Sequence, residues 1–118
     1  MSENFIEYKG KKYKTKIKNN NLSLKLSRKK IANISDIRRI NEIADLQILR
    51  INNNQIKEIK GLENLSKLHT LYLNHNLISE IKGLDNLAEL RRLDLSNNQI
   101  KKISGLETLK NLQRLKHL

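Results

Sequence analysis

Residues 46–67 read LQILRINNNQIKEIKGLENLSK, and residues 68–89 repeat that pattern as LHTLYLNHNLISEIKGLDNLAE. A third copy, LRRLDLSNNQIKKISGLETLKN, spans residues 90–111. Leucine, asparagine, isoleucine and glycine return to matching positions every 22 residues. One copy is too short to bury its own leucines, so neighbouring copies must stack around a shared apolar column. The repeat therefore predicts a solenoid.

The first half of each copy predicts a short strand. Leu71 and Leu73 alternate with Thr70, Tyr72 and Asn74, which is the two-residue period of a half-buried strand. We expect the two leucines to face the core. The other three side chains should then lie on an open face of the sheet.

An asparagine follows each strand at the point where the chain must bend. An amide side chain both donates and accepts hydrogen bonds, so a stack of asparagines can satisfy backbone groups that a tight bend leaves unpaired. We therefore predict a structural ladder of Asn54, Asn76 and Asn98 rather than a ligand site.

The second half of each copy returns the chain to the next strand. Its isoleucine pairs, of which Ile100 and Ile103 are the last, should keep the core filled. The leucines that follow are three residues apart, a spacing that favours short 3₁₀ or single-turn segments over long helices. Gly61, Gly83 and Gly105 precede these turns, where a residue without a Cβ is useful.

The consensus L-x-x-L-x-L-x-x-N-x-I-x-x-I-x-G-L-x-x-L resembles the leucine-rich-repeat family. Its period is similar to that of the class found in the protein-phosphatase regulatory subunit and in internalins. The resemblance covers residues 22–118. It implies an α/β solenoid: a right-handed curved stack with a parallel β-sheet on its concave face and short 3₁₀ or α turns on its convex face. It also implies that the variable strand positions bind a partner.

The domain organisation follows from the repeat. The leucine-rich-repeat domain spans residues 22–118, and its first unit, residues 22–45, is degenerate. Lys29 replaces the asparagine there, Asp36 replaces the glycine, and the unit is three residues longer. Full repeats occupy residues 46–67, 68–89 and 90–111, and residues 112–118 form a partial repeat or a helix.

Residues 1–21 are predicted to form an N-terminal cap. Phe5 to Ile17 alternates in polarity around Gly10, which indicates a β-hairpin. Placed beside the first repeat strand, the hairpin would cover the open end of the stack, and its outward lysines would protect a sheet edge from aggregation. The alternative is a flexible basic arm for phosphates or lipid head groups.

The C-terminal end allows two interpretations. Residues 112–118 begin a further repeat, but His117 stands where the second strand leucine belongs. Ser104 and Glu107 match a helix capping box, so residues 105–118 could instead close the stack as a helix. If the end is open, a homodimer through it is a further expectation.

The net charge of +12 arises from 24 lysines and arginines against 12 acidic residues. Such an excess fits an acidic protein partner, nucleic acid or an anionic membrane, or a lysine-rich proteome with no functional meaning. The chain has no cysteine, no signal-peptide pattern at its N-terminus and no apolar run that could span a membrane. We therefore expect a cytoplasmic protein.

No motif for catalysis is present. There is no glycine-rich phosphate loop, and no serine has the histidine and aspartate partners of a nucleophile. His69 and His75 lie six residues apart on opposite sides of a strand, so they cannot share a metal ion. We expect no enzymatic activity, no cofactor and no metal.

The outward strand positions supply the candidate binding residues. They are Arg50, Tyr72, His75, Arg92, Asp94 and Arg114. Tyrosine and arginine dominate the binding energy of many protein interfaces. We therefore predict that they bind an unidentified protein that carries an acidic patch. The competing interpretation is that Tyr72 only pairs with Arg50, and Arg92 only with Asp94.

The alternative function is binding of nucleic acid or an anionic membrane by the basic surface. The scarcity of aromatic residues, with one phenylalanine and no tryptophan, weakens it for single-stranded nucleic acid, which binds by stacking on aromatic side chains.

Overall fold

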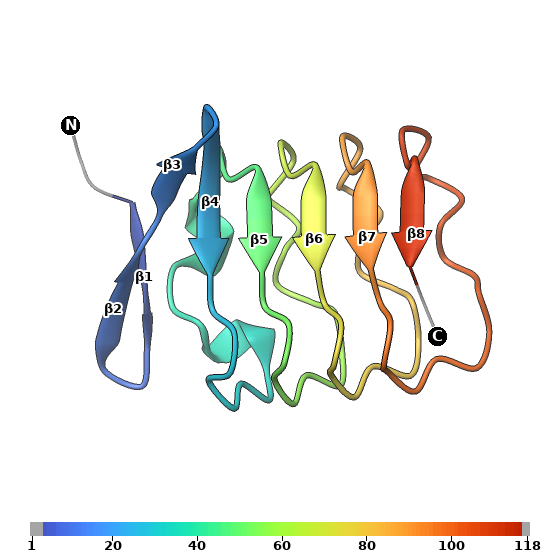
Figure 1. The fold of residues 1–118 in the computed structure, drawn as a ribbon, viewed down its shortest axis with the longest axis horizontal. Helices are drawn as coiled ribbons and strands as arrows, with labels where there is room; N and C mark the ends of the chain where they lie inside the picture. Colours follow the sequence, from blue (N-terminus) through green and yellow to red (C-terminus); the bar gives the residue numbers. More distant parts are fainter. Residues whose placement is uncertain (1–3, 117–118) are drawn as a thin grey trace.

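The computed structural model describes residues 4–116, which form a row of stacked coils with their strands side by side (Figure 1). Strands β1 (Phe5–Tyr8) and β2 (Lys11–Lys14) make a separate antiparallel pair. All other strands belong to one six-stranded sheet, in chain order. They are β3 (Lys16–Lys18), β4 (Asn21–Lys25), β5 (Ile48–Arg50), β6 (Thr70–Tyr72), β7 (Arg92–Asp94) and β8 (Arg114–Lys116).

The sheet is parallel from β4 to β8, and its register follows the repeat. Leu49 pairs with Leu71, which pairs with Leu93, so each strand lies one 22-residue period from the next. The step from β4 to β5 pairs Leu24 with Leu49, because the first unit is three residues longer. The predicted solenoid with a parallel sheet is confirmed.

The inward leucines and isoleucines form one continuous core. Leu71 and Leu73 are 0% exposed, as predicted, and Tyr72 is half-buried on the opposite face. Thr70, which we expected on the open face, is only 5% exposed. Its hydroxyl lies 2.8 Å from Nδ1 of His69, and the neighbouring ring helps to cover it.

A ladder of asparagine amides joins the coils at the bend after each strand. The Nδ2 atom of Asn76 donates to the carbonyl of Leu73 in its own coil (3.0 Å) and to that of Ile51 in the preceding coil (3.1 Å). Its Oδ1 atom accepts the backbone N–H of Ile56 at 3.0 Å. Asn54 and Asn98 repeat this arrangement, so each amide satisfies backbone groups of two successive coils.

The return segments of the full repeats are successive tight turns rather than helices. The backbone N–H of Leu65 donates to the carbonyl of Leu62, and that of Leu68 to Leu65, in a three-residue pattern that recurs in the next two coils. Among the described residues, 3₁₀ helices occur only in the longer first unit, as η1 (Ile34–Asp36) and η2 (Ile40–Glu42).

The glycines before these turns have left-handed backbones, but their surroundings differ. Gly61 and Gly83 have φ angles of +80° and +78°. A Cβ on Gly83 would collide with the carbonyl oxygen of Ile59 in the preceding coil, whereas a Cβ on Gly61 would meet only ordinary contacts. Gly83 is therefore needed both for its conformation and for the close approach of two coils.

The N-terminal hairpin covers the first coil differently from our expectation. Its turn places Lys9 and Gly10 at φ angles of 50° and 78°, as a two-residue hairpin turn requires. Ile6 and Tyr8 are buried, and Glu7 exchanges two backbone hydrogen bonds with Arg38 of the first return segment. The hairpin therefore docks on the return side.

The segment that pairs with the first repeat strand is β3, not the hairpin. The extended segment is interrupted at Thr15, whose N–H and hydroxyl both donate to the Asn4 carbonyl. After Thr15 the chain leaves the two-stranded sheet and enters the six-stranded one. Ile17 consequently leaves the alternation that the sequence suggested and is 70% exposed.

The C-terminal end of the stack is open in the part that the structure describes. Residues 105–116 form turns and strand β8, so the predicted alternative of a closing helix is wrong over this range. Ile103, expected in the core, is 42% exposed, whereas Ile59 and Ile81 at the same position are 1% and 5% exposed. No following coil covers Ile103 within residues 4–116. His117 lies outside the described residues.

Replacing Asn76 by alanine should destabilise the fold strongly. The change leaves buried backbone groups of two coils without partners, and each such group costs about 1–3 kcal/mol. We expect a loss of at least about 2 kcal/mol in the free energy of unfolding, measured by urea titration. Asn86→Ala, at an exposed asparagine, is the control and should change stability little. Equal stability of the two variants would contradict a structural ladder.

Replacing Gly83 by alanine should cost more than the same change at Gly61. Both substitutions impose about 1–2 kcal/mol of left-handed strain. Only Gly83→Ala also forces two coils apart, which should add at least about 1 kcal/mol. Thermal and urea unfolding of the two variants measure this difference directly. Identical losses would show that conformation alone sets the need for glycine here.

Candidate functional site

The outward side chains of β4 to β8, which we call the strand face, form rows because the strands are in register. One row runs through Arg50, Tyr72, Asp94 and Lys116, each opposite the next. The Arg50 guanidinium lies 4.6 Å from the centre of the Tyr72 ring, a cation–π contact. Part of the competing interpretation is therefore correct, since Tyr72 does pair with Arg50.

Asp94 has a structural contact of its own. Its Oδ1 atom accepts the backbone N–H of Ser96 at 3.0 Å and the hydroxyl of Ser96 at 2.6 Å. The same carboxylate thus supports the bend after β7. No ion pair between Asp94 and Arg92 exists among residues 4–116.

A second row brings two like charges together. Arg92 of β7 pairs in register with Arg114 of β8, and both side chains are exposed. Like charges directly opposite each other on neighbouring strands are unfavourable. No carboxylate in the described part of the chain forms an ion pair with either arginine. The strand face therefore holds cationic groups that nothing within residues 4–116 neutralises by an ion pair.

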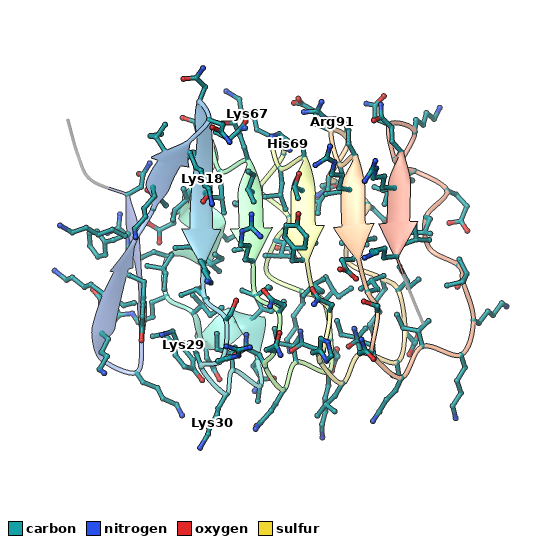
Figure 2. The ribbon with its side chains drawn as sticks, viewed as in Figure 1. Lys18, Lys29, Lys30, Lys67, His69 and Arg91 are labelled. Carbon is teal, nitrogen blue, oxygen red and sulfur yellow. The ribbon has the colours of Figure 1, made fainter. Side chains whose placement is uncertain are left out.

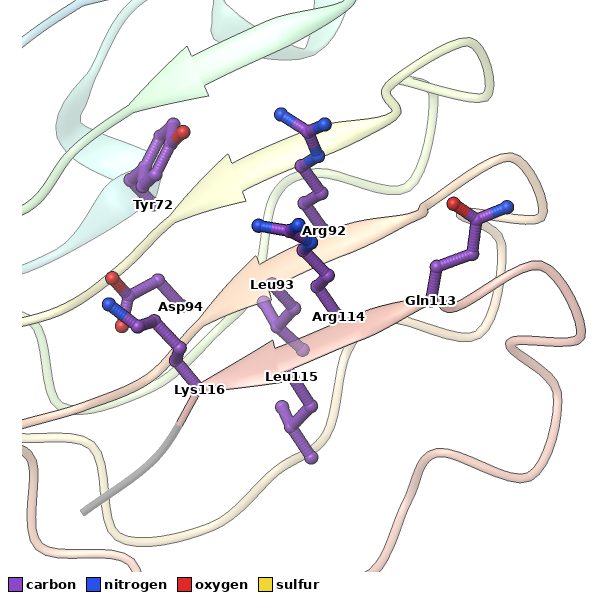
Figure 3. Close-up of a pocket in the computed structure, with 8 residues that line it drawn as sticks. All are labelled: Tyr72, Arg92, Leu93, Asp94, Gln113, Arg114, Leu115 and Lys116. Atoms are coloured by element: carbon purple, nitrogen blue, oxygen red, sulfur yellow. The ribbon is translucent and has the colours of Figure 1, made fainter.

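These rows line a groove of about 480 Å³, which we call the tyrosine groove. Its polar lining residues are Tyr72, Arg92, Asp94, Gln113, Arg114 and Lys116. Figure 3 shows Arg92 and Arg114 side by side on one side of the sheet, with Leu93 and Leu115 on the other. Four of the six predicted binding residues, Tyr72, Arg92, Asp94 and Arg114, thus meet in one groove, and Arg50 adjoins it through Tyr72.

His75, the sixth predicted residue, does not line the tyrosine groove. Its backbone is left-handed, with φ of 57°, because it lies in the bend after β6. Its Nε2 atom lies 3.2 Å from the Asn97 amide, and its side chain is exposed. His75 lies in the bend rather than in the strand, so it is not among the residues that meet in this groove.

The two-residue alternation in the sequence did not reveal Arg91 as a residue of the strand face, because each strand begins with irregular hydrogen bonding. The His69 carbonyl accepts the N–H groups of both Arg91 (2.9 Å) and Arg92 (3.0 Å). Two residues therefore oppose one, as in a β-bulge, which redirects side chains. Arg91 and Arg92 consequently line the same hollow. The signal was in the sequence: two residues separate the inward Leu90 and Leu93, and a strict two-residue period allows only one.

His69 is held in a fixed position at the start of β6. Its Nε2 atom lies 3.1 Å from Asn21 Oδ1, and its Nδ1 atom lies 2.8 Å from the Thr70 hydroxyl. Burial lowers the pKa of His69 below its ordinary 6.5, and the charges of Arg91 and Arg92 lower it further. The Glu89 carboxylate acts in the opposite direction on the same pKa, as a smaller effect.

A third concave region, which we call the basic groove, lies between β2, β3 and the first strands of the repeat domain. It has a volume of about 540 Å³ and is lined by Lys12, Lys14, Lys16, Lys18, Lys25 and Arg50 together with Tyr13, Ile17 and Ser23. Within residues 4–116, no acidic side chain is among its lining residues.

Neither a metal-binding cluster nor a membrane-spanning helix is found among the described residues. No group of three or more histidine, aspartate or glutamate side chains lies close enough to hold a metal ion in residues 4–116. Over the same range, no helix has the length and apolarity that crossing a bilayer demands.

The stacked coils, the asparagine ladder and the variable strand face define a solenoid repeat protein. A family model described as leucine-rich repeats (two copies) matches residues 44–86 and 88–116. These matches cover more than half of the chain, which therefore belongs to the leucine-rich-repeat family. Domains of this family are in general protein-interaction modules and are typically non-enzymatic.

Solved structures of internalins are similar to this chain. Internalin C2 from Listeria monocytogenes shares 39% sequence identity with a TM-score of 0.72, over 80% of this chain and 41% of that one. Internalin F from the same bacterium shares 26% identity with a TM-score of 0.54, over 80% of this chain and 33% of that one. The chain thus spans less than half the length of either internalin. Among curated protein sequences, none matches.

Proposed function

We propose that this protein is a non-enzymatic interaction module that binds a partner protein through its strand face, with the tyrosine groove at the centre. The observation that carries this proposal is the convergence on one sheet of a half-exposed tyrosine and two arginines that form no ion pair within residues 4–116. Aromatic and arginine side chains in a concave patch provide most of the binding energy at many interfaces. The repeat core holds these residues in place before binding, which lowers the entropic cost of association.

The chemistry of the partner follows from the charges. Arg92 and Arg114 repel each other across neighbouring strands, and a carboxylate placed between them would relieve that repulsion. Arginine also binds carboxylates through two parallel hydrogen bonds. We therefore propose that the partner presents an acidic patch, with an apolar or aromatic group beside it for Tyr72.

The double variant Tyr72→Ala/Arg92→Ala should abolish partner capture while the fold stays intact. Each truncation of a central interface residue costs about 2 kcal/mol or more, so the two together should weaken binding at least a hundredfold. The measurement is affinity capture from a lysate of the organism that encodes the protein, with the bound proteins compared quantitatively between variants.

The matched control is Lys101→Ala/Lys102→Ala, which removes two exposed cations from a return segment. It should retain every protein that the unmodified chain captures. Circular dichroism and thermal unfolding of both variants verify that the fold is preserved. Undiminished capture by the Tyr72 and Arg92 variant would show that the strand face is not the binding surface.

The basic groove favours a second candidate function, binding of nucleic acid or an anionic membrane. Several lysines and Arg50 converge on this groove, and Lys16 and Lys18 are exposed. If this groove contacts phosphates of duplex DNA, the logarithm of the affinity should fall by about 0.9 per contact as the logarithm of the salt concentration rises. Filter binding across a salt series measures that slope.

The change Lys16→Gln/Lys18→Gln should then reduce the magnitude of the salt slope by about 2, while Lys101→Gln/Lys102→Gln should leave it unchanged. Equal slopes for both variants would show non-specific attraction by the net charge. Absence of binding to both DNA and anionic vesicles at low salt would exclude this function.

Self-association through the open C-terminal end is a separate proposal. It is supported by the exposure of Ile103 and by the half-buried Leu106, Leu112 and Leu115 near it. Sedimentation velocity at several protein concentrations tests it, and a single monomeric species at all of them would overturn it.

A further inference from the structure

A small hollow at the start of β6, β7 and β8 adjoins the tyrosine groove. We call it the arginine hollow, and its lining residues are Asn21, His69, Thr70, Arg91, Arg92 and Gln113. Its volume is about 240 Å³. Figure 2 shows His69 and Arg91 together at this end of the sheet. Only Arg92 and Gln113 also line the tyrosine groove.

The lining of the hollow suits an anion. Two guanidinium groups, an imidazole, two side-chain amides and a hydroxyl face it, and the described part of the chain adds no carboxylate to this lining. Within residues 4–116, neither Arg91 nor Arg92 takes part in an ion pair. Arg114 stands opposite Arg92 on the next strand and adds a third positive charge nearby. The Glu89 carboxylate acts on His69 but does not line the hollow.

The positions of these groups are set by the backbone. The bulge-like start of β7 directs Arg91 and Arg92 to the same side, although they are adjacent in sequence. His69 is anchored between Asn21 and the Thr70 hydroxyl, so its ring is fixed before any ligand arrives. The backbone therefore brings the two arginine side chains to one side of the sheet, next to a ring that is already held.

We propose that the arginine hollow binds a tetrahedral oxyanion, such as a phosphoryl or sulfate group, through the guanidinium groups of Arg91 and Arg92, with the His69 ring beside them as a further positive charge when it is protonated. Guanidinium groups bind such anions through paired, charge-assisted hydrogen bonds. The hollow is smaller than the roughly 300–1,000 Å³ of pockets that enclose drug-sized ligands. It therefore suits one small anionic group rather than a larger molecule.

The charge of His69 couples the site to pH. Without an anion, the neighbouring arginines and burial hold the pKa of His69 below 6.5. A bound dianion offsets the arginine charges and stabilises the protonated ring, so it raises this pKa. Anion affinity should therefore increase as the pH falls through the range in which His69 gains its proton.

Anion binding in the arginine hollow goes beyond the proposed partner binding, and it can be disproved while partner binding still holds. Arg91 lines the arginine hollow but not the tyrosine groove. The variant Arg91→Gln should therefore lose the anion and keep the captured partners of the unmodified chain. The proposed partner binding, in turn, can fail while a free anion still binds.

The test is a titration of the full chain with sodium sulfate at constant ionic strength, followed by NMR of the histidine ring signals. Sulfate is the probe because its own charge does not change between pH 5 and pH 8. We expect a saturable shift of the His69 signals and a rise in the pKa of His69. The His75 signals, from the exposed bend, should change little and act as an internal control.

Three variants test which residues bind the anion. Arg91→Gln should weaken sulfate binding about tenfold or more, as expected for loss of a hydrogen bond from a charged donor. Lys101→Gln, which removes one exposed charge elsewhere, should leave the affinity within about twofold of the unmodified chain. His69→Gln should retain binding but remove its pH dependence.

A second arm distinguishes the source of the anionic group. Inorganic phosphate is compared with a short peptide that carries one phosphoserine, and with the same peptide unphosphorylated. Saturable binding of phosphate or phosphopeptide that depends on Arg91 supports the site, and tighter binding of the phosphopeptide assigns the group to a partner protein. A linear, non-saturating response, or equal weakening by Arg91→Gln and Lys101→Gln, would overturn the proposal.

Discussion

The coils are held together by a chain of amide hydrogen bonds at the bend after each strand. The carbonyl of Ile51 accepts from both Asn54 and Asn76, and that of Leu73 from both Asn76 and Asn98. The hydrogen bonds of each asparagine therefore fix the spacing between its own coil and the preceding coil. The bend would otherwise bury unpaired backbone groups, which are costly inside a protein. The shared leucine core supplies most of the stabilisation, but the ladder sets the spacing at which that core can pack.

Fixed spacing has a direct consequence for the strand face. Residues one period apart stand opposite each other on adjacent strands, about 4.8 Å apart, whatever their chemistry. This places Arg50 on Tyr72, which is favourable, and Arg92 beside Arg114, which is not. The unfavourable pair persists because the core and the ladder, rather than the outward side chains, determine the register. The binding properties of this face are therefore decided by which residues occupy equivalent positions in successive repeats.

Much of the site could be predicted from the sequence, because its position in the repeat is local information. The alternation around Tyr72 correctly placed Tyr72, Arg92, Asp94 and Arg114 on one face. His75 lies outside the tyrosine groove because a left-handed residue in the bend no longer follows the strand period. The hydrogen bonds that start each strand join two coils, so a strict two-residue period did not reveal His69 and Arg91. The two residues between the inward Leu90 and Leu93 were the only sign of this irregularity within the coil.

The sequence by itself determined the solenoid, the inward leucines and the asparagine ladder, since these depend only on residue types at a fixed period. Only the tertiary structure decided how the ends behave: that β3 rather than the hairpin pairs with β4, and that Ile103 is exposed where Ile59 and Ile81 are buried. It also decided that Arg91 and His69 share a hollow. The physical reason is that burial and side-chain proximity depend on the neighbouring coil. The sequence of one repeat does not specify whether a neighbouring coil covers it or how closely that coil approaches.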